Sequence, residues 1–248
     1  MPHLMNGPLA VTAEDPRISE ALLTPDPPMP RYLEQVYWWA YVHPRAVHVF
    51  EREWLVNAIL FGNYGRLRDD ALADLGDPVH GRTLQVACVY GNLTARLQQR
   101  LAPDARLDVV DILPIQLKNL GRKLSRDERL RLLCNDSASL ACEDASYDQV
   151  LMFFLLHEQP EHVRRATLAE AMRVVKPGGR VVIVDYHQPS PWHPMRALMR
   201  LVFRKLEPYA IDLWRHEISE FMPQGTRSAS LSKRTYFGGL YQKLVLIR

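Results

Sequence analysis

The residues most able to bind a ligand follow two apolar segments that are typical of buried strands. The first segment runs into the stretch QVACVYGNLT, where Gly91 precedes an expected helix. Glycine lets the backbone approach a ligand closely, and the N-terminus of a helix offers unpaired N–H groups. The second segment, RLDVVD, ends at Asp111, about 20 residues further on, where an acid can accept two hydrogen bonds from ribose hydroxyls. The spacing predicts a nucleotide-type site, although Asp111 also suits the N-cap of the helix that follows.

Two histidines stand where acid–base or metal chemistry would be placed. His157 follows the apolar run YDQVLMFFLL, and His187 follows RVVIVDY. Imidazole titrates near neutral pH and is a common metal ligand, so both histidines are candidate catalytic residues. Each could equally be a capping or packing histidine. Arg164 and Arg165, by contrast, fit the solvated face of a helix.

Short apolar runs alternate with amphipathic stretches from residue 82 onward. The runs RTLQVA, RLDVVD, LRLLCND, YDQVLMFFLL and RVVIVDY indicate strands separated by helices. This alternation predicts an α/β fold with a mostly parallel, Rossmann-like sheet that helices cover on both faces. The final stretch, KRTYFGGLYQKLVLIR, predicts a closing hairpin with an antiparallel last strand. Ligands of such sheets bind outside the carboxyl ends of the strands, where the candidate residues lie.

The chain before residue 79 divides into two parts. Residues 1–31 are a proline-rich arm with little expected regular structure. Residues 32–78 are rich in aromatic side chains, and we expect helices over 33–42 and 44–61, with a proline beginning the second. These helices either pack on the core or form a lid over an apolar substrate.

Residues 79–248 form the main domain, and an insertion at 189–230 interrupts its alternation. Residues 194–207 carry an apolar stripe at helical spacing, made of Met195, Leu198, Met199, Val202, Phe203 and Leu206. Basic residues flank this stripe. The helix either packs on the domain as a lid or lies on an anionic membrane surface.

The composition favours an ordinary globular protein, with 47% hydrophobic and 24% charged residues. A net charge of +3 does not indicate a nucleic-acid partner, and nothing in the sequence indicates an oligomeric state. The three cysteines form no CxxC pair, which fits a reducing cytoplasm. No apolar run is long enough to span a bilayer. We therefore expect a cytoplasmic protein, free or bound at a membrane surface.

The order of elements and four motifs resemble the class I S-adenosylmethionine (SAM) dependent methyltransferases, over about residues 80–188 and the last strands. The motifs are A-C-x-x-G-x-L-T in the first turn, Asp111, Asn135-Asp136 after the third strand, and RVVKPGGRVVIVD, whose KPGG should make a sharp turn. The resemblance implies SAM as cofactor, with Asn135 and Asp136 near its adenine, although both residues also favour a plain turn. The positions that it places at the cofactor are Gln85, Ala87, Val89, Tyr90, Gly91, Asn92, Asp111, Ile112, Asn135, Asp136 and Phe153.

The first turn departs from that family at three positions. Gln85 stands where the family has an acid that handles the methionine ammonium of SAM, and Val89 and Tyr90 replace small residues. A nearby opposite charge favours the charged form of an amine, so a neutral Gln85 makes the free amine easier to reach. Tyr90 could orient that amine or shuttle a proton. The alternative is that SAM binding has been lost and that the fold serves as a non-catalytic binding protein.

A more specific resemblance is to the rhodoquinone biosynthesis methyltransferase-like proteins, the RquA family, from about Tyr32 to the C-terminus. It rests on ACVYG together with YWWAYVHPRAV and EREWLVNAILFGN. It implies that the protein converts ubiquinone to rhodoquinone, with SAM donating an amino group that replaces a ring methoxy group and manganese assisting. Mn²⁺ prefers oxygen and imidazole ligands, and His157 and His187 are the candidate ligands.

Ubiquinone lies in the bilayer, so we expect the protein to associate peripherally with the inner membrane. The enzymatic alternative is an ordinary SAM-dependent methyltransferase that acts on a quinone or another lipophilic ring.

Overall fold

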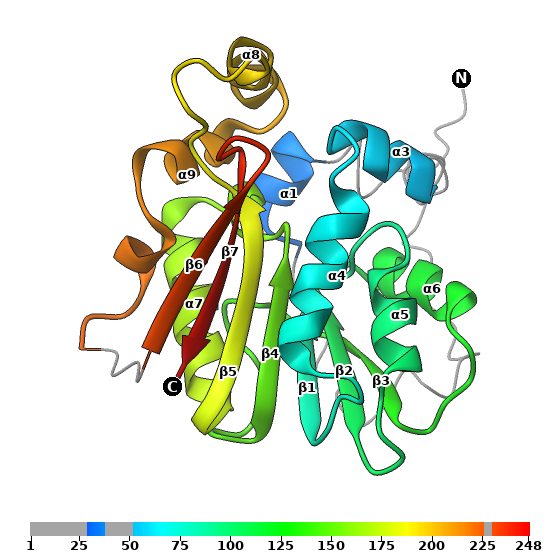
Figure 1. Cartoon of the computed structure of the whole chain (residues 1–248). Helices are drawn as coiled ribbons and strands as arrows, with labels where there is room; N and C mark the ends of the chain where they lie inside the picture. The colour runs from blue at the N-terminus through cyan, green and yellow to red at the C-terminus, as the bar shows by residue number, and fades with distance from the viewer. Residues whose placement is uncertain (1–28, 38–51, 226–229) are drawn as a thin grey trace, which may run out of the picture.

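Seven strands form one sheet in the computed structural model, which describes residues 29–37, 52–225 and 230–248. Their order is β3-β2-β1-β4-β5-β7-β6 (Figure 1). The strands are β1 (Arg82–Val86), β2 (Arg106–Asp111), β3 (Leu130–Cys134), β4 (Tyr147–Phe153), β5 (Val175–Tyr186), β6 (Ser230–Tyr236) and β7 (Tyr241–Ile247). β1 to β5 pair in parallel, whereas β7 runs antiparallel to β5 and β6. The expected mostly parallel sheet with an antiparallel last strand is confirmed.

Side chains along the inner strands alternate between two cores, one on each face of the sheet. Leu151 and Phe153 of β4 belong to one core, whereas Val150 and Met152 belong to the other. Successive side chains of a strand point to opposite faces, so a strand covered on both faces is an unbroken apolar run. The helices that cover the faces are α4 (Tyr64–Leu75), α5 (Leu93–Gln99) and α6 (Pro114–Lys123) on the first and α7 (Glu161–Val174) on the second (Figure 1).

Shorter helices complete the described part of the chain. They are α1 (Arg31–Val36), α3 (Glu53–Ile59), α8 (Arg196–Lys205), α9 (Asp212–Arg215) and the 3-10 turns η3 (Leu156–Glu158), η4 (Pro208–Ile211) and η5 (Ile218–Phe221). Helices α1, α3 and α8 lie beyond the carboxyl ends of the parallel strands (Figure 1). None of the helices in the described ranges has the length and apolar character to cross a bilayer.

The two N-terminal helices differ from their expected bounds. α1 stops at Val36, short of residue 42, because Tyr37 (φ −112°) leaves the helical conformation. α3 begins only at Glu53, so the single helix expected over 44–61 is wrong. The residues between these two helices, and most of the expected proline-rich arm, lie outside the described residues.

The KPGG segment is part of β5 and not a turn before it, which corrects the expectation. β5 starts at Val175 directly after α7, and Val175 pairs with Tyr147. The register then shifts, so that Gln149 pairs with Arg180. The residues in between bulge out of the ladder, and Gly178 has a φ of +78°, which few residues other than glycine adopt readily.

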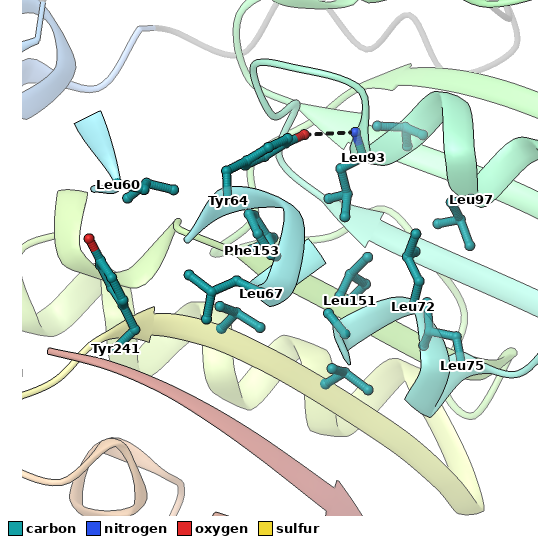
Figure 2. Packing of buried hydrophobic residues seen from close by; sticks show 14 of the residues in the cluster. Leu60, Tyr64, Leu67, Leu72, Leu75, Leu93, Leu97, Leu151, Phe153 and Tyr241 are labelled. Carbon is teal, nitrogen blue, oxygen red and sulfur yellow. Dashed lines mark hydrogen bonds between the residues drawn. The ribbon is translucent and has the colours of Figure 1, made fainter. Parts of the chain in front are cut away.

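Tyr64 joins α4 to the loop that follows β1. Its ring lies in the core with Leu67 and Phe153, and its hydroxyl accepts hydrogen bonds from the backbone N–H groups of Asn92 (2.8 Å) and Leu93 (3.0 Å) (Figure 2). The first N–H groups of a helix have no partner within the helix, so this hydroxyl satisfies donors at the start of α5. A Cβ at Gly91 would lie 2.5 Å from the same oxygen, so only glycine fits there.

We expect Tyr64→Phe to lower the free energy of unfolding by about 1–3 kcal/mol, because it leaves two backbone donors without an acceptor. Urea unfolding followed by circular dichroism measures this loss. Tyr241→Phe is the matched control, since the buried Tyr241 hydroxyl has no hydrogen-bond partner in the described part of the chain and its removal should be neutral or stabilising. Equal losses in the two variants would contradict the role assigned to Tyr64.

Candidate active site

A cavity of about 540 Å³ lies beyond the carboxyl ends of β1, β2, β4 and β5. Small-molecule sites usually occupy roughly 300–1,000 Å³. Apolar side chains of α1, α3 and α8, among them Leu33, Val56 and Val202, line much of the cavity wall. The polar groups come from the loops after β1 and β2 and from η3 with its neighbours. The cavity therefore joins the expected nucleotide site to the expected acid–base site.

The loop after β1 supplies Ala87, Val89 and Tyr90 to the cavity wall, as expected for cofactor contacts. Ala87 has a φ of +73°, a backbone conformation that is costly for a residue with a Cβ. The Tyr90 hydroxyl accepts a hydrogen bond from Gln116 Nε2 (3.0 Å). This contact holds the phenol against α6, at the edge of the cavity.

Gln85 lies behind this wall and is fully buried. Its Nε2 donates to the Ala87 carbonyl (3.0 Å), and its Oε1 accepts from the Thr94 hydroxyl (3.0 Å). Gln85 thus ties the end of β1 to α5 and is not among the residues that line the cavity. Its influence on the cofactor stays a prediction.

Gly91 and Asn92 face α3 and α4 instead of the cavity. The Asn92 side chain accepts a hydrogen bond from Arg68 Nη1 (2.6 Å) and donates to Glu53 Oε2 (2.7 Å). The Gly91 carbonyl accepts from Lys123 Nζ (3.0 Å). The two residues therefore fix the loop to its neighbours, and a direct cofactor contact from them stays a prediction.

Asp111 and Ile112, after β2, both line the cavity. The Asp111 carboxylate accepts the N–H of Cys88 through Oδ2 (2.7 Å) and the N–H of Leu113 through Oδ1 (2.8 Å). Burial raises the pKa of Asp111 to about 6, although both hydrogen bonds act in the opposite direction. The capping alternative is wrong, because the N-cap of α6 is Leu113 and no side chain caps this helix. Asp111 instead fixes the segment between β2 and α6. Each carboxylate oxygen keeps lone pairs for a ligand, and the ribose contact stays a prediction.

Asn135 and Asp136 build the turn after β3. Asn135 Oδ1 accepts the N–H of Ala141 (3.0 Å), and Asp136 Oδ1 accepts the N–H of Ala138 (2.8 Å). Neither side chain lines the cavity, although the neighbouring Ser137 does. The plain-turn alternative therefore describes what their side chains do here, and the adenine contact stays a prediction.

Phe153 ends β4 and lies in the cavity wall next to Phe154. Phe154 has a φ of +54° and packs edge-on against Tyr186 and His157, with ring centroids 5.3 and 6.0 Å away. Aromatic rings therefore surround the imidazole that follows β4 and exclude water from it.

His157 is buried in the cavity wall on η3 and is oriented by Asp185 at the end of β5. His157 Nδ1 donates to Asp185 Oδ1 (3.0 Å), and Asp185 also accepts the backbone N–H groups of Leu156 (2.8 Å) and Tyr186 (2.7 Å). Burial alone would lower the pKa of His157, but Asp185 and the carboxylates of Glu207 and Glu158 raise it to about 9. At neutral pH the imidazole is therefore a cation that can act as a proton donor.

Glu207, which the sequence reasoning missed, completes this end of the cavity. Its Oε2 lies 4.0 Å from His157 Nε2, and Tyr37 from the N-terminal segment hydrogen-bonds its carboxyl group. Burial raises the pKa of Glu207, against the opposing effects of His157 and Tyr37. The only signal in the sequence was an acidic residue directly after an amphipathic helix. Many helices end in this way, so the signal did not indicate a site residue.

Arg164 corrects another expectation, because it is fully buried and not on a solvated helix face. Its guanidinium donates to the carbonyl oxygens of Leu156 (2.9 Å), Gln159 (2.8 Å) and Tyr209 (3.0 Å). These contacts clamp η3 to η4. Arg164 therefore fixes the backbone that carries His157, whereas Arg165 forms an exposed ion pair with Glu161.

His187 lies apart from this cavity, so the structure does not bring the two candidate metal ligands together. His187 Nδ1 bonds the Gly239 carbonyl (2.7 Å), and its Nε2 lies 3.0 Å from Lys233 Nζ. Among the described residues, no group of three or more His, Cys, Asp or Glu side chains could hold a metal ion. The residues present do not fit a manganese ion held by His157 and His187, and we derive no step through such an ion.

We expect the stabilising effect of His157 to depend on pH. Its pKa is raised from 6.5 to about 9 on folding, so the stabilisation is complete below pH 6.5 and disappears as the pH rises through about 9. The shift corresponds to about 3 kcal/mol. Urea unfolding should therefore show the difference between the wild type and His157→Gln shrinking over this range. His162→Gln, on the exposed face of α7, is the control for loss of a histidine. A constant difference for His157→Gln would contradict the assignment.

Comparisons with known proteins agree with this architecture. Residues 83–179 match the family described as "Methyltransferase domain". The demethylmenaquinone methyltransferase of Staphylococcus aureus (strain JH9) is 30% identical over 136 residues, which are 55% of this chain and 56% of that protein. The match thus spans little more than half the length of this relative.

Two solved structures illustrate the likeness in fold. Human N-acetylserotonin methyltransferase in complex with SAM has a TM-score of 0.60 at 14% identity, covering 88% of this chain and 62% of that chain. Phosphoethanolamine N-methyltransferase 2 of Haemonchus contortus in complex with SAM has a TM-score of 0.59 at 12% identity, covering 88% and 59%. The protein therefore has the fold of the class I SAM-dependent methyltransferases, and its residues 83–179 are similar to a methyltransferase domain.

Proposed function

We propose that this protein binds SAM and acts on the ring of a membrane quinone, and that it converts ubiquinone to rhodoquinone with SAM as the amino donor. The observation that carries the proposal is one continuous apolar cavity with the β1 and β2 loops in its wall and the buried His157–Asp185 pair beside them. A site that only bound SAM would need no proton donor such as His157.

The SAM part of the proposal is supported by the loops after β1 and β2. A structure of the same fold contains SAM, and Ala87, Val89 and Asp111 line the cavity at the carboxyl ends of β1 and β2. The carboxyl ends of parallel strands are the usual ligand site of such sheets. Because the side chains of Val89 and Tyr90 line this site, it is narrower than a site built from glycines.

The quinone part of the proposal is supported by the cavity walls and by the relatives. The matching Staphylococcus aureus proteins are named demethylmenaquinone methyltransferases, which act on a quinone. Leu33, Val56, Ile59 and Val202 offer an apolar surface to a lipophilic ring. The mostly apolar lining also disfavours a highly charged substrate, because burying unpaired charge is costly.

The chemistry that we assign begins with the free amine of SAM attacking the ring carbon that bears a methoxy group. The electron pair moves to the ring carbonyl oxygen and returns to expel methoxide. The imidazolium of His157 donates a proton to the departing oxygen, which leaves as methanol, and the proton that the nitrogen loses replaces it. The N–Cα bond of the methionine moiety then breaks by elimination. A proton leaves the neighbouring Cβ, a Cα=Cβ double bond forms, and nitrogen takes the electron pair of the N–Cα bond and a proton. The amino group thus stays on the ring, and the unsaturated sulfonium carboxylate leaves. The manganese that the resemblance implies has no part in these steps.

An ordinary methyl transfer to a quinone is the second candidate function, and the name of the Staphylococcus aureus relatives favours it. Against it stands Gln85, which is neutral where the resembled family has an acid at the methionine end. A site that holds SAM as a methyl donor gains from an ammonium paired with a carboxylate.

The decisive experiment is mass spectrometry of the quinone products formed from ubiquinone and SAM labelled with ¹⁵N at its amino group, with Mn²⁺ present. We expect the label in an aminoquinone, together with methanol, and the mass of the co-product reports how the N–Cα bond breaks. A parallel run with a ¹³C-methyl label is the control. Transfer of the methyl label alone identifies the methyltransferase, and the absence of SAM binding would leave a non-catalytic binding protein.

Gln85→Glu tests whether the neutral side chain behind the methionine end of SAM favours the free amine. A carboxylate there should favour the ammonium form of SAM, so SAM should bind more tightly while amination slows by about tenfold or more. Calorimetric titration and turnover measure the two effects. Thr94→Val is the matched control, because it removes the hydroxyl bonded to Gln85 without adding charge. If Gln85→Glu left both the affinity for SAM and the turnover unchanged, the lack of charge at position 85 would have no such effect.

A further inference from the structure

A second cavity, of about 470 Å³, lies between α8 and the η4–α9 segment. Four arginines line it, and no acidic residue does; they are Arg196, Arg200, Arg204 and Arg215. Phe203 and Trp214 form apolar parts of the wall. We refer to this cavity as the arginine groove.

The arginines of the groove are available for a ligand. Arg196 is held by a hydrogen bond to the Pro189 carbonyl (2.7 Å) and lies over the Trp214 ring (5.8 Å from the guanidinium carbon to the ring centroid). The side chains of Arg200, Arg204 and Arg215 are exposed and make no hydrogen bond or ion pair with another described residue. Like charges gathered without a counter-charge attract an anion, and guanidinium groups bind phosphate oxygens in pairs.

An exposed apolar row runs along α8 next to these arginines. Arg196, Arg200 and Arg204 are spaced by one helical turn and share one side of the helix. Leu201 lies on the next side of the helix and Leu198 farther round, and 52% and 45% of their surfaces are exposed. The expected apolar stripe of this helix is therefore divided, because Met199 and Phe203 are buried whereas Leu198 faces solvent. A helix with a basic side and an exposed apolar side suits the interface of an anionic bilayer.

Exposed apolar side chains at this end of the molecule also line the active-site cavity. Leu206 after α8 and Ile59 of α3 both line that cavity and are exposed, at 43% and 45%. α8 and α3 lie at the same end of the molecule, beyond the carboxyl ends of the sheet (Figure 1). A bilayer in contact with α8 would therefore face the opening through which a lipophilic substrate enters.

We propose that the arginine groove binds the phosphate of an anionic phospholipid headgroup and that Leu198 and Leu201 enter the bilayer interface beside it. Three observations argue for this occupant. They are the positive charge of the groove, the guanidinium groups of Arg200, Arg204 and Arg215 that no described residue binds, and the exposed apolar row on α8. This membrane contact rests on the proposed function, because it gives a lipid-borne substrate a route to the active-site cavity. Vesicle binding itself requires neither SAM nor turnover. Loss of turnover with vesicle binding intact would refute the proposed function alone.

The test is co-sedimentation of the full chain with vesicles of phosphatidylglycerol and phosphatidylcholine, compared with vesicles of phosphatidylcholine only. We expect binding to the anionic vesicles that weakens as sodium chloride is added. The double variant Arg200→Glu with Arg204→Glu should bind at least about tenfold more weakly. The matched control reverses two exposed arginines elsewhere, Arg106 and Arg126, with the same change in net charge and should bind like the wild type.

Further measurements separate the headgroup from other anions. Leu198→Ser with Leu201→Ser should also weaken vesicle binding, which a site for free phosphate does not predict. All these side chains are exposed, so circular dichroism should show unchanged folding in every variant. Equal losses in the groove and control variants, binding of inorganic phosphate as tight as that of vesicles, or a preference for single-stranded RNA over vesicles would each overturn the proposal.

Discussion

The Asp185 carboxylate, buried at the end of β5, holds the acid–base part of the site together. It accepts the backbone N–H groups of Leu156, His157 and Tyr186 as well as the imidazole N–H of His157. A buried carboxylate is tolerated only when its oxygens are fully paired, and here every partner belongs to η3 or to β5 itself. The same contacts that satisfy the charge therefore fix the turn after β4 and direct His157 Nε2 toward Glu207.

The two parts of the active-site cavity use their polar side chains differently. At the expected cofactor end, Gln85, Asp111, Asn135 and Asp136 bond mainly to backbone groups and give the loops their shape. Around His157, charged groups from separate segments converge on one imidazole. Shape is therefore set by local contacts within each loop, whereas the acidity of the site arises from residues brought together by the fold.

Much of the sheet could be predicted because each strand carries its own local signal. The apolar runs and the hairpin at Gly238-Gly239 needed no knowledge of distant contacts, and Ala87, Val89, Asp111 and His157 were expected in the site. Arg164 could not be placed, because arginine is seldom buried. Its spacing is that of the buried face of α7, but only the carbonyl groups of η3 and η4 explain how its charge is accommodated there. Glu207 and the separation of His187 from His157 likewise depend on how distant segments pack, which no local pattern records.

The contact between Tyr64 and the turn at Gly91 links two distant positions of the sequence in evolution. Any side chain at 91 would meet the Tyr64 hydroxyl, and a smaller residue at 64 would leave the start of α5 without an acceptor. Proteins that share this arrangement should therefore inherit the glycine and the tyrosine as a pair. Gly91 also has a φ of +87°, so loss of the tyrosine alone would not release the glycine.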